Sequence, residues 1–63
     1  MKQSRLIKIE EVLKRCAISR ATLYRLIADQ RFPYQVSLTG SRAIAWREED
    51  VQRWIEERPT LSK

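Results

Sequence analysis

The sequence predicts a small α+β domain in which three helices are combined with a β-hairpin placed between the second and third helices. Apolar residues recur at helical spacing in three segments, and between the second and third of these the chain alternates apolar and polar residues on both sides of its only glycine, Gly40. A chain of 63 residues makes one such domain, near the size at which a single core is only marginally stable.

A short strand and a first helix account for the beginning of the chain. Residues 5–7 alternate enough to form an edge strand. The next helix, of about two turns, is predicted by apolar residues at helical spacing, namely Ile9, Val12, Leu13 and Cys16. Glu10 and Glu11 lie in its first turn, where the helix dipole favours anions. Cys16 is therefore interpreted as a core residue, with a redox role as the alternative.

A second helix is predicted to begin only two residues later. Ser19 is a good N-cap, because its hydroxyl can accept from the N–H groups of the first turn. The packing stripe of this helix consists of Leu23, Leu26 and Ile27. We expect the helix to end near residues 30–31, because Phe32 precedes Pro33 and residues before proline avoid helical dihedral angles.

Two helices joined by so short a turn predict a helix-turn-helix, whose second helix enters the DNA major groove and reads bases mainly with its N-terminal residues. The residues that lie away from the packing stripe are Arg20, Ala21, Tyr24, Arg25 and Ala28. We expect Arg20 and Arg25 to contact DNA; the alternative for each is an ordinary solvated arginine. The ring of Tyr24 either packs at the core edge or brings its hydroxyl to a phosphate.

The hairpin is predicted from residues 34–38 and 42–46, which alternate on either side of a turn at residues 39–41. Its tip is small, polar and basic, and Arg42 lies beside it. Such a tip suits a wing that contacts the sugar-phosphate backbone or the minor groove. The alternative is a hairpin that only covers the helical core.

A third helix is expected to open at residues 47–50, where three acids complement the helix dipole, and to end before Pro59. Its buried stripe consists of Val51, Trp54 and Ile55. Trp46 and Trp54 are expected in the core, and an aromatic platform for stacking bases is the alternative.

The charge distribution favours a polyanionic partner. The net charge of +5 divides into +7 over residues 1–47, with ten Lys and Arg against three acids, and −2 over residues 48–63, with three against five. Nine of the thirteen cations are arginine, which suits planar contacts to phosphates or bases. One basic face turned to a polyanion fits this asymmetry, although a merely solvated surface is the simpler alternative.

Composition excludes several classes of site. The single cysteine cannot form an internal disulfide, and the absence of histidine removes the usual zinc spacings and any Ser-His or Cys-His pair. We therefore expect no enzyme activity, metal, cofactor or small-molecule ligand. No segment resembles a signal peptide or approaches the ~20 apolar residues of a membrane span, so a soluble cytoplasmic protein is expected.

Residues 5–58 resemble the AlpA family of prophage transcriptional regulators, which is related to small phage excisionases, and the order of elements resembles the MerR-like winged-helix fold. The residues that carry the resemblance are "RLI" at 5–7, "EV" at 11–12, "SRATLYRL" at 19–26, "FP" at 32–33, "AW" at 45–46 followed by acids, and "WIEER" at 54–58. The resemblance implies a recognition helix that includes Ser19, Arg20, Thr22, Tyr24 and Arg25, and a wing at residues 39–42.

We therefore expect a winged helix-turn-helix domain over residues 5–58, with flexible termini at residues 1–4 and 59–63. Its expected function is sequence-specific binding of double-stranded DNA as a transcriptional regulator of a prophage or mobile element, with control of integrase expression or excision as one form of it. The expected DNA-binding residues are Ser19, Arg20, Ala21, Thr22, Tyr24, Arg25, Gly40, Ser41 and Arg42.

Two alternatives to this function remain open at the level of sequence. One is an excisionase-type recombination directionality factor that acts architecturally, and the other is a small protein-interaction module such as an antirepressor. Because one recognition helix and one wing cover only a short site, we also expect a monomer whose copies cooperate on adjacent sites. No coiled-coil extension is expected beyond Pro59.

Overall fold

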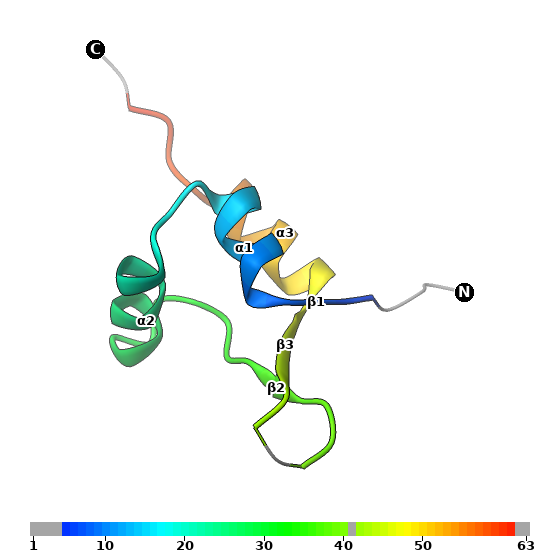
Figure 1. The fold of residues 1–63 in the computed structure, drawn as a ribbon. Coiled ribbons are helices and arrows are strands. Elements are labelled where there is room, and N and C mark those ends of the chain that lie inside the picture. Colours follow the sequence, from blue (N-terminus) through cyan, green and yellow to red (C-terminus); the bar gives the residue numbers. More distant parts are fainter. Residues whose placement is uncertain (1–4, 41, 62–63) are drawn as a thin grey trace.

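The structure is a computed structural model that describes residues 5–40 and 42–61 (Figure 1). In chain order its elements are β1 (Leu6–Ile7), α1 (Ile9–Cys16), α2 (Arg20–Ala28), β2 (Val36–Ser37), β3 (Ile44–Arg47) and α3 (Glu48–Glu56). The predicted α+β class, with a hairpin between the second and third helices, is confirmed. Ser41 and the predicted flexible termini, apart from residues 59–61, lie outside the described residues.

The three strands form one antiparallel sheet in the order β1-β3-β2. β1 is therefore an edge strand, as predicted, and it pairs with β3 so that Leu6 lies opposite Arg47. On the other side of β3, Val36 of β2 lies opposite Ala45. The sheet thus brings the beginning of the chain against the strand that leads into α3.

The hairpin strands differ in length from the prediction. β2 is limited to Val36–Ser37, whereas the prediction places this strand at residues 34–38. Pro33 has no N–H to donate, and its carbonyl oxygen accepts from the Trp46 indole instead of from a neighbouring strand. β3 begins at Ile44, two residues later than predicted, and extends to Arg47, one residue further than predicted. α3 consequently begins at Glu48, whose N–H donates to the carbonyl of Arg5 at 2.7 Å.

One hydrophobic core joins the sheet to all three helices. Its buried members are Ile7, Val12, Leu23, Phe32, Trp46, Val51 and Trp54. The prediction that both tryptophans lie in the core is confirmed, since Trp46 is 0% and Trp54 is 9% exposed. Cys16 is partly buried against this core, as expected, and burial raises the pKa of its thiol.

Both indole N–H groups bond to the segment that follows α2. Trp54 Nε1 donates to the carbonyl oxygen of Arg31 at 2.8 Å, and Trp46 Nε1 donates to that of Pro33 at 3.1 Å. Between them, the ring of Phe32 packs on Trp54 with 4.9 Å between centroids. The connection between α2 and the hairpin is therefore fixed by three aromatic side chains.

The ends of α1 and α2 depend on residues in the left-handed region. Ala17, with φ 58°, ends α1. Gln30, with φ 59°, ends α2, where its N–H donates to Ile27 O at 3.0 Å and the N–H of Arg31 donates to Leu26 O at 2.8 Å. This pair of bonds is a Schellman motif. It ends α2 at Ala28, so the predicted end near residues 30–31 is wrong by two or three residues.

Candidate nucleic-acid interface

The N-terminus of α2 is held by a hydroxyl pair. Ser19 Oγ accepts from the N–H of Thr22 at 3.2 Å and donates to Thr22 Oγ1 at 2.9 Å. The predicted N-cap is therefore confirmed. These bonds fix the first turn of α2, and they occupy the hydroxyl of Ser19 with capping.

The packing and exposed sides of α2 are clearly separated. Leu23 is fully buried in the core, and Leu26 and Ile27 pack against it from partly buried positions. The exposed side consists of Arg20, Ala21, Tyr24, Arg25 and Ala28, and Thr22 is half-buried at its margin. Tyr24 is 44% exposed, so much of its ring is accessible. Of the residues expected to contact DNA, the structure brings those of α2 onto one surface.

The arginines of this surface are not neutralised within the protein. Arg20 and Arg25 make no side-chain hydrogen bond or ion pair with any other residue in the described part of the chain. Acidic side chains elsewhere do have cationic partners: Glu11 and Glu48 both bind Arg15 at 2.8 and 2.7 Å. Positive charge is consequently left available on α2.

The hairpin tip is stabilised by a bond that the sequence analysis missed. The N–H of Gly40 donates to Ser37 Oγ at 2.7 Å, and Gly40 has φ 80°. A serine three residues before a glycine is a recognisable turn signal, so this bond could have been found. Arg42 is exposed beside the tip, and the expected contact residue Ser41 lies outside the described residues.

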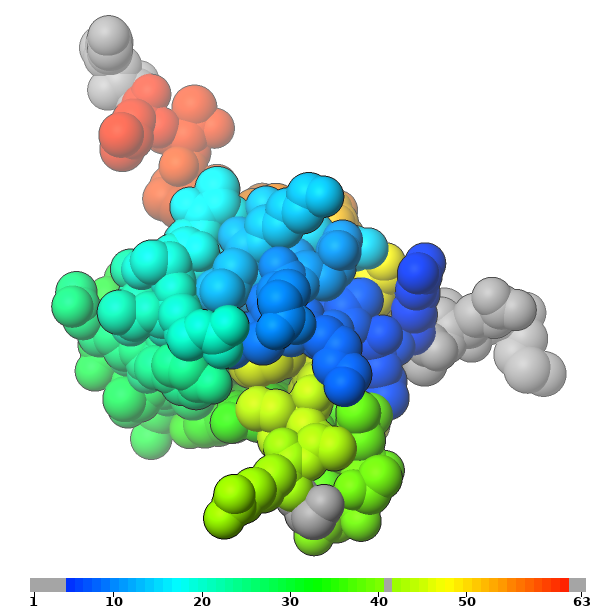
Figure 2. Space-filling view, viewed as in Figure 1, coloured from blue at the N-terminus to red at the C-terminus, as the bar shows by residue number. Residues whose placement is uncertain are grey.

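α2 and the hairpin are accessible from the same side of the molecule. In Figure 2, α2 forms the left flank, the hairpin projects at the lower edge, and α1 lies above and between them. The structure therefore presents two separate exposed elements, joined by the segment to which both indole N–H groups bond (Figure 1).

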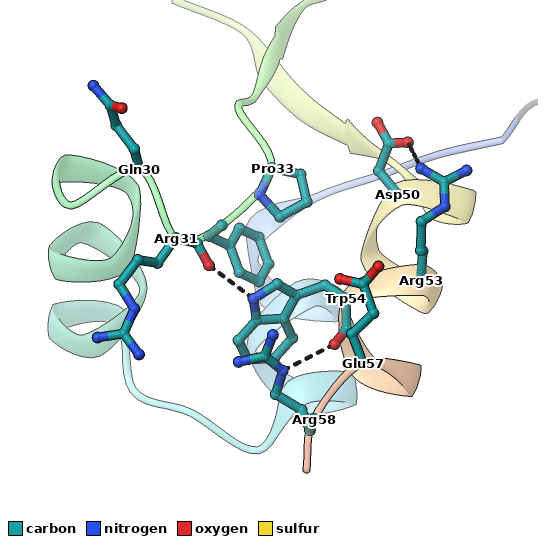
Figure 3. A pocket seen from close by; sticks show the side chains of 9 residues that line it. Gln30, Arg31, Pro33, Asp50, Arg53, Trp54, Glu57 and Arg58 are labelled. Carbon is teal, nitrogen blue, oxygen red and sulfur yellow. Dashed lines mark hydrogen bonds and ion pairs between the residues drawn. The ribbon is translucent and has the colours of Figure 1, made fainter.

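A pocket of about 380 Å³ lies elsewhere, between the end of α2 and the second half of α3 (Figure 3). Arg58 covers the Trp54 ring at 4.1 Å from its centroid and donates to the Trp54 carbonyl oxygen at 3.0 Å. Asp50 and Arg53 form a 3.6 Å ion pair at its rim. Cations and acids are mixed around this pocket, and it carries no set of groups typical of a catalytic site.

The described residues form neither a metal-binding cluster nor a membrane-spanning helix. Within residues 5–40 and 42–61, no group of three or more histidine, cysteine, aspartate or glutamate side chains could hold a metal ion. In the same part of the chain no helix has the length and apolar character needed to cross a bilayer.

Comparison with known proteins adds two similarities. The family model described as "Prophage CP4-57 regulatory protein (AlpA)" matches residues 5–59. A curated protein of Enterobacteria phage P4, "Uncharacterized protein ORF88", is 42% identical over 53 residues, which cover 84% of this chain. This chain spans 59% of the length of that relative. No solved structure matches significantly.

Proposed function

Because the chain belongs to the AlpA family of prophage regulatory proteins, we propose that it regulates transcription by binding double-stranded DNA at specific sequences. In this proposal the exposed side of α2 enters the major groove, and the tip of the hairpin contacts the backbone or minor groove beside it. The regulated genes belong to a prophage or mobile element, and control of integrase expression or excision is one form of this activity.

The observation that carries the proposal is the position of Arg20 and Arg25. Both are exposed on α2 away from the buried Leu23, and neither has an ion-pair partner among the described residues. Unpaired arginines on the exposed side of a capped helix fit bidentate contacts to guanine or phosphate. Arg42 on the hairpin adds a second point of contact, which an acidic protein partner would not require.

The test begins with selection of bound duplexes from a random library by the purified protein. We expect enrichment of one sequence, and tighter binding to that duplex than to a scrambled one at moderate salt. Enrichment of no sequence, with equal binding to both duplexes, would contradict the proposal.

Mapping the bound sites on the host chromosome then defines the role. Sites at a promoter support transcriptional regulation. Sites grouped at an attachment region would instead favour an architectural factor of recombination, which uses the same DNA contacts. This second experiment separates the two functions because they differ in the location of the sites.

A further inference from the structure

The two faces of the sheet differ in what covers them. Residues directly opposite one another in an antiparallel pair point to the same side, and successive residues point to opposite sides. Ile7 and Trp46 are such a pair, and both lie in the core with the three helices. The register therefore turns Leu6 and Arg47 to the other side of the sheet.

The same reasoning extends across β3 to the hairpin. Val36 lies opposite Ala45, and these residues share the side of Arg47. The N–H of Leu38 donates to the carbonyl oxygen of Ala43 at 2.8 Å, which continues the pairing and places both on that side. We call this surface the outer sheet face, and its members are Leu6, Val36, Leu38, Ala43, Ala45 and Arg47.

The outer sheet face is apolar where a solvated face is ordinarily polar. Ala45 forms its floor at 1% exposure, while Leu6 and Leu38 at the two edges are 45% and 38% exposed. The solvated side of an antiparallel sheet normally carries polar residues in alternation with a buried apolar side. Contiguous apolar side chains on both sides of such a sheet indicate an interaction surface.

The charged residues of the outer sheet face itself are cations. Arg47 is exposed on this face, and Lys8, extended at φ −83° and ψ 167° two residues after Leu6, follows on the same side. Beside the β1 edge, Glu10 and Glu11 of α1 line a surface hollow together with Leu6 and Lys8, and Glu11 is paired with Arg15. None of the residues that the register places on this face is acidic. A second copy of the chain would bring like charges together across the interface, whereas an acidic partner would pair with them.

We propose that the outer sheet face is the docking surface for an acidic amphipathic segment of another protein. Its apolar side chains cover Leu6, Ala45 and Leu38, and its carboxylates pair with Arg47 and Lys8. This interaction uses the side of the sheet opposite to the helices, so it leaves the exposed side of α2 uncovered, and it approaches the proposed DNA site only where Leu38 and Ala43 flank the hairpin tip. It gives the domain a protein partner in addition to its proposed DNA site.

The first test is a titration of the protein, followed by NMR, with two synthetic peptides of equal length. One alternates leucine with glutamate, and the other alternates leucine with lysine. We expect the glutamate peptide to shift the amide signals of residues 6–8, 36–38 and 43–47, and to bind at least ~10-fold more tightly than the lysine peptide. Equal affinity for the two peptides, or shifts centred on α2, would overturn the proposal.

Variants then test the surface itself. The double variant Lys8→Glu/Arg47→Glu should reverse the preference between the peptides, while Lys14→Glu, which reverses a single charge on α1, should leave it unchanged. Leu6→Thr keeps a residue that favours strands, and it should lower the affinity for the glutamate peptide severalfold. A preference unchanged in the double variant, or a free protein whose dimer interface covers the outer sheet face, would also overturn the proposal.

DNA binding is measured on the same variants. Leu6→Thr should bind the selected duplex as the wild type does, because this leucine of β1 belongs neither to α2 nor to the hairpin tip. Loss of peptide binding with DNA binding retained shows that the two proposals succeed or fail separately.

Discussion

Arg15 joins α1 to the first turn of α3, because its Nη1 lies 2.7 Å from Glu48 Oε2 while its Nε donates to Glu11 Oε2 at 2.8 Å. One guanidinium thus binds two carboxylates on different helices. A lysine has a single ammonium and cannot reproduce this fork. The pairing links the helix that precedes α2 to the helix that follows the hairpin.

The first prediction concerns pH. The hydrogen bond from Arg15 lowers the pKa of the Glu11 carboxyl from its ordinary value of 4.5. Because the lowered pKa belongs to the folded state, the stabilisation is complete above about pH 4.5 and is lost as the pH falls through the folded-state value. Near neutral pH, the wild type should therefore unfold at a higher temperature than Glu11→Gln. This difference in unfolding temperature should become smaller in acid.

Thermal unfolding of both proteins across this pH range measures the effect. Glu10→Gln, one position earlier on α1, is the matched control and should show a smaller pH-dependent difference. A constant difference between wild type and Glu11→Gln at all pH values would contradict the assignment.

The second prediction concerns the end of α1. Ala17 has φ 58°, and this conformation costs an L-residue about 1–2 kcal/mol that glycine does not pay. Glycine also loses more chain entropy on folding, which offsets part of the gain. Ala17→Gly should therefore stabilise the protein by up to ~1 kcal/mol, as measured by denaturant unfolding.

A glycine introduced at a right-handed helical position should lower the stability of the protein, in contrast to Ala17→Gly. Ala28→Gly, at the exposed end of α2, is expected to destabilise the protein. If Ala17→Gly lowered stability as Ala28→Gly does, the left-handed position of Ala17 would be the wrong explanation.

The third prediction tests the proposed DNA contacts of α2. Arg20→Ala or Arg25→Ala should weaken binding to the selected duplex by ~1–3 kcal/mol if that arginine reads guanine, and should relax preference at one base pair. Lys14→Ala removes the same charge from α1 and should have a smaller effect. Equal binding by wild type and the Arg20→Ala/Arg25→Ala double variant would exclude this surface.

The fourth prediction concerns the hairpin. Arg42→Ala should weaken binding to all sequences to a similar extent, and it should reduce the slope of log affinity against log salt by about one, as expected for loss of one phosphate contact. Titrations at several salt concentrations measure the slope. An unchanged slope would indicate that the hairpin serves only to cover the core.

The fifth prediction is that the free protein is a monomer and that its copies bind adjacent sites in the same orientation cooperatively, since a single domain covers only a short site. If neighbouring copies bend the DNA, the bend costs ~1–6 kcal/mol for a site of 20–30 base pairs and must be offset by their contacts. Sedimentation of the free protein and electrophoresis on duplexes with one, two or three sites test this. A tight dimer without DNA, or independent filling of the sites, would refute it.

Local signals explain why much of the fold could be predicted. The cap at Ser19 and the burial of Leu23 follow from residues close together in sequence, and both are confirmed. The end of α2 could not be predicted in the same way, because Gln30 carries no intrinsic preference for the left-handed region comparable to that of glycine. The proline signal at Pro33 predicts a later end, because it restricts only Phe32, which lies beyond the last helical residue, Ala28.

The features of the fold that could not be predicted depend on contacts between residues far apart in sequence. The pairing of β1 with β3 joins residues about forty positions apart, and no pattern within β1 identifies its partner. The bridge from Arg15 to Glu48 also joins residues that are distant in sequence. For the candidate site, the residue types and the helix could be predicted from the sequence. That Arg20 and Arg25 have no ion-pair partner among the described residues could be seen only in the three-dimensional structure.

The bonds from Trp46 and Trp54 to the segment after α2 have a consequence for how this domain can diversify. The spacing between α2 and the hairpin is set by buried indoles and two backbone carbonyl groups, none of which belongs to the exposed side of α2. Exposed side chains at positions such as 20 and 25 can therefore be exchanged without disturbing the frame that holds them. In a library randomised on the exposed side of α2, every member would therefore keep the same spacing between α2 and the hairpin.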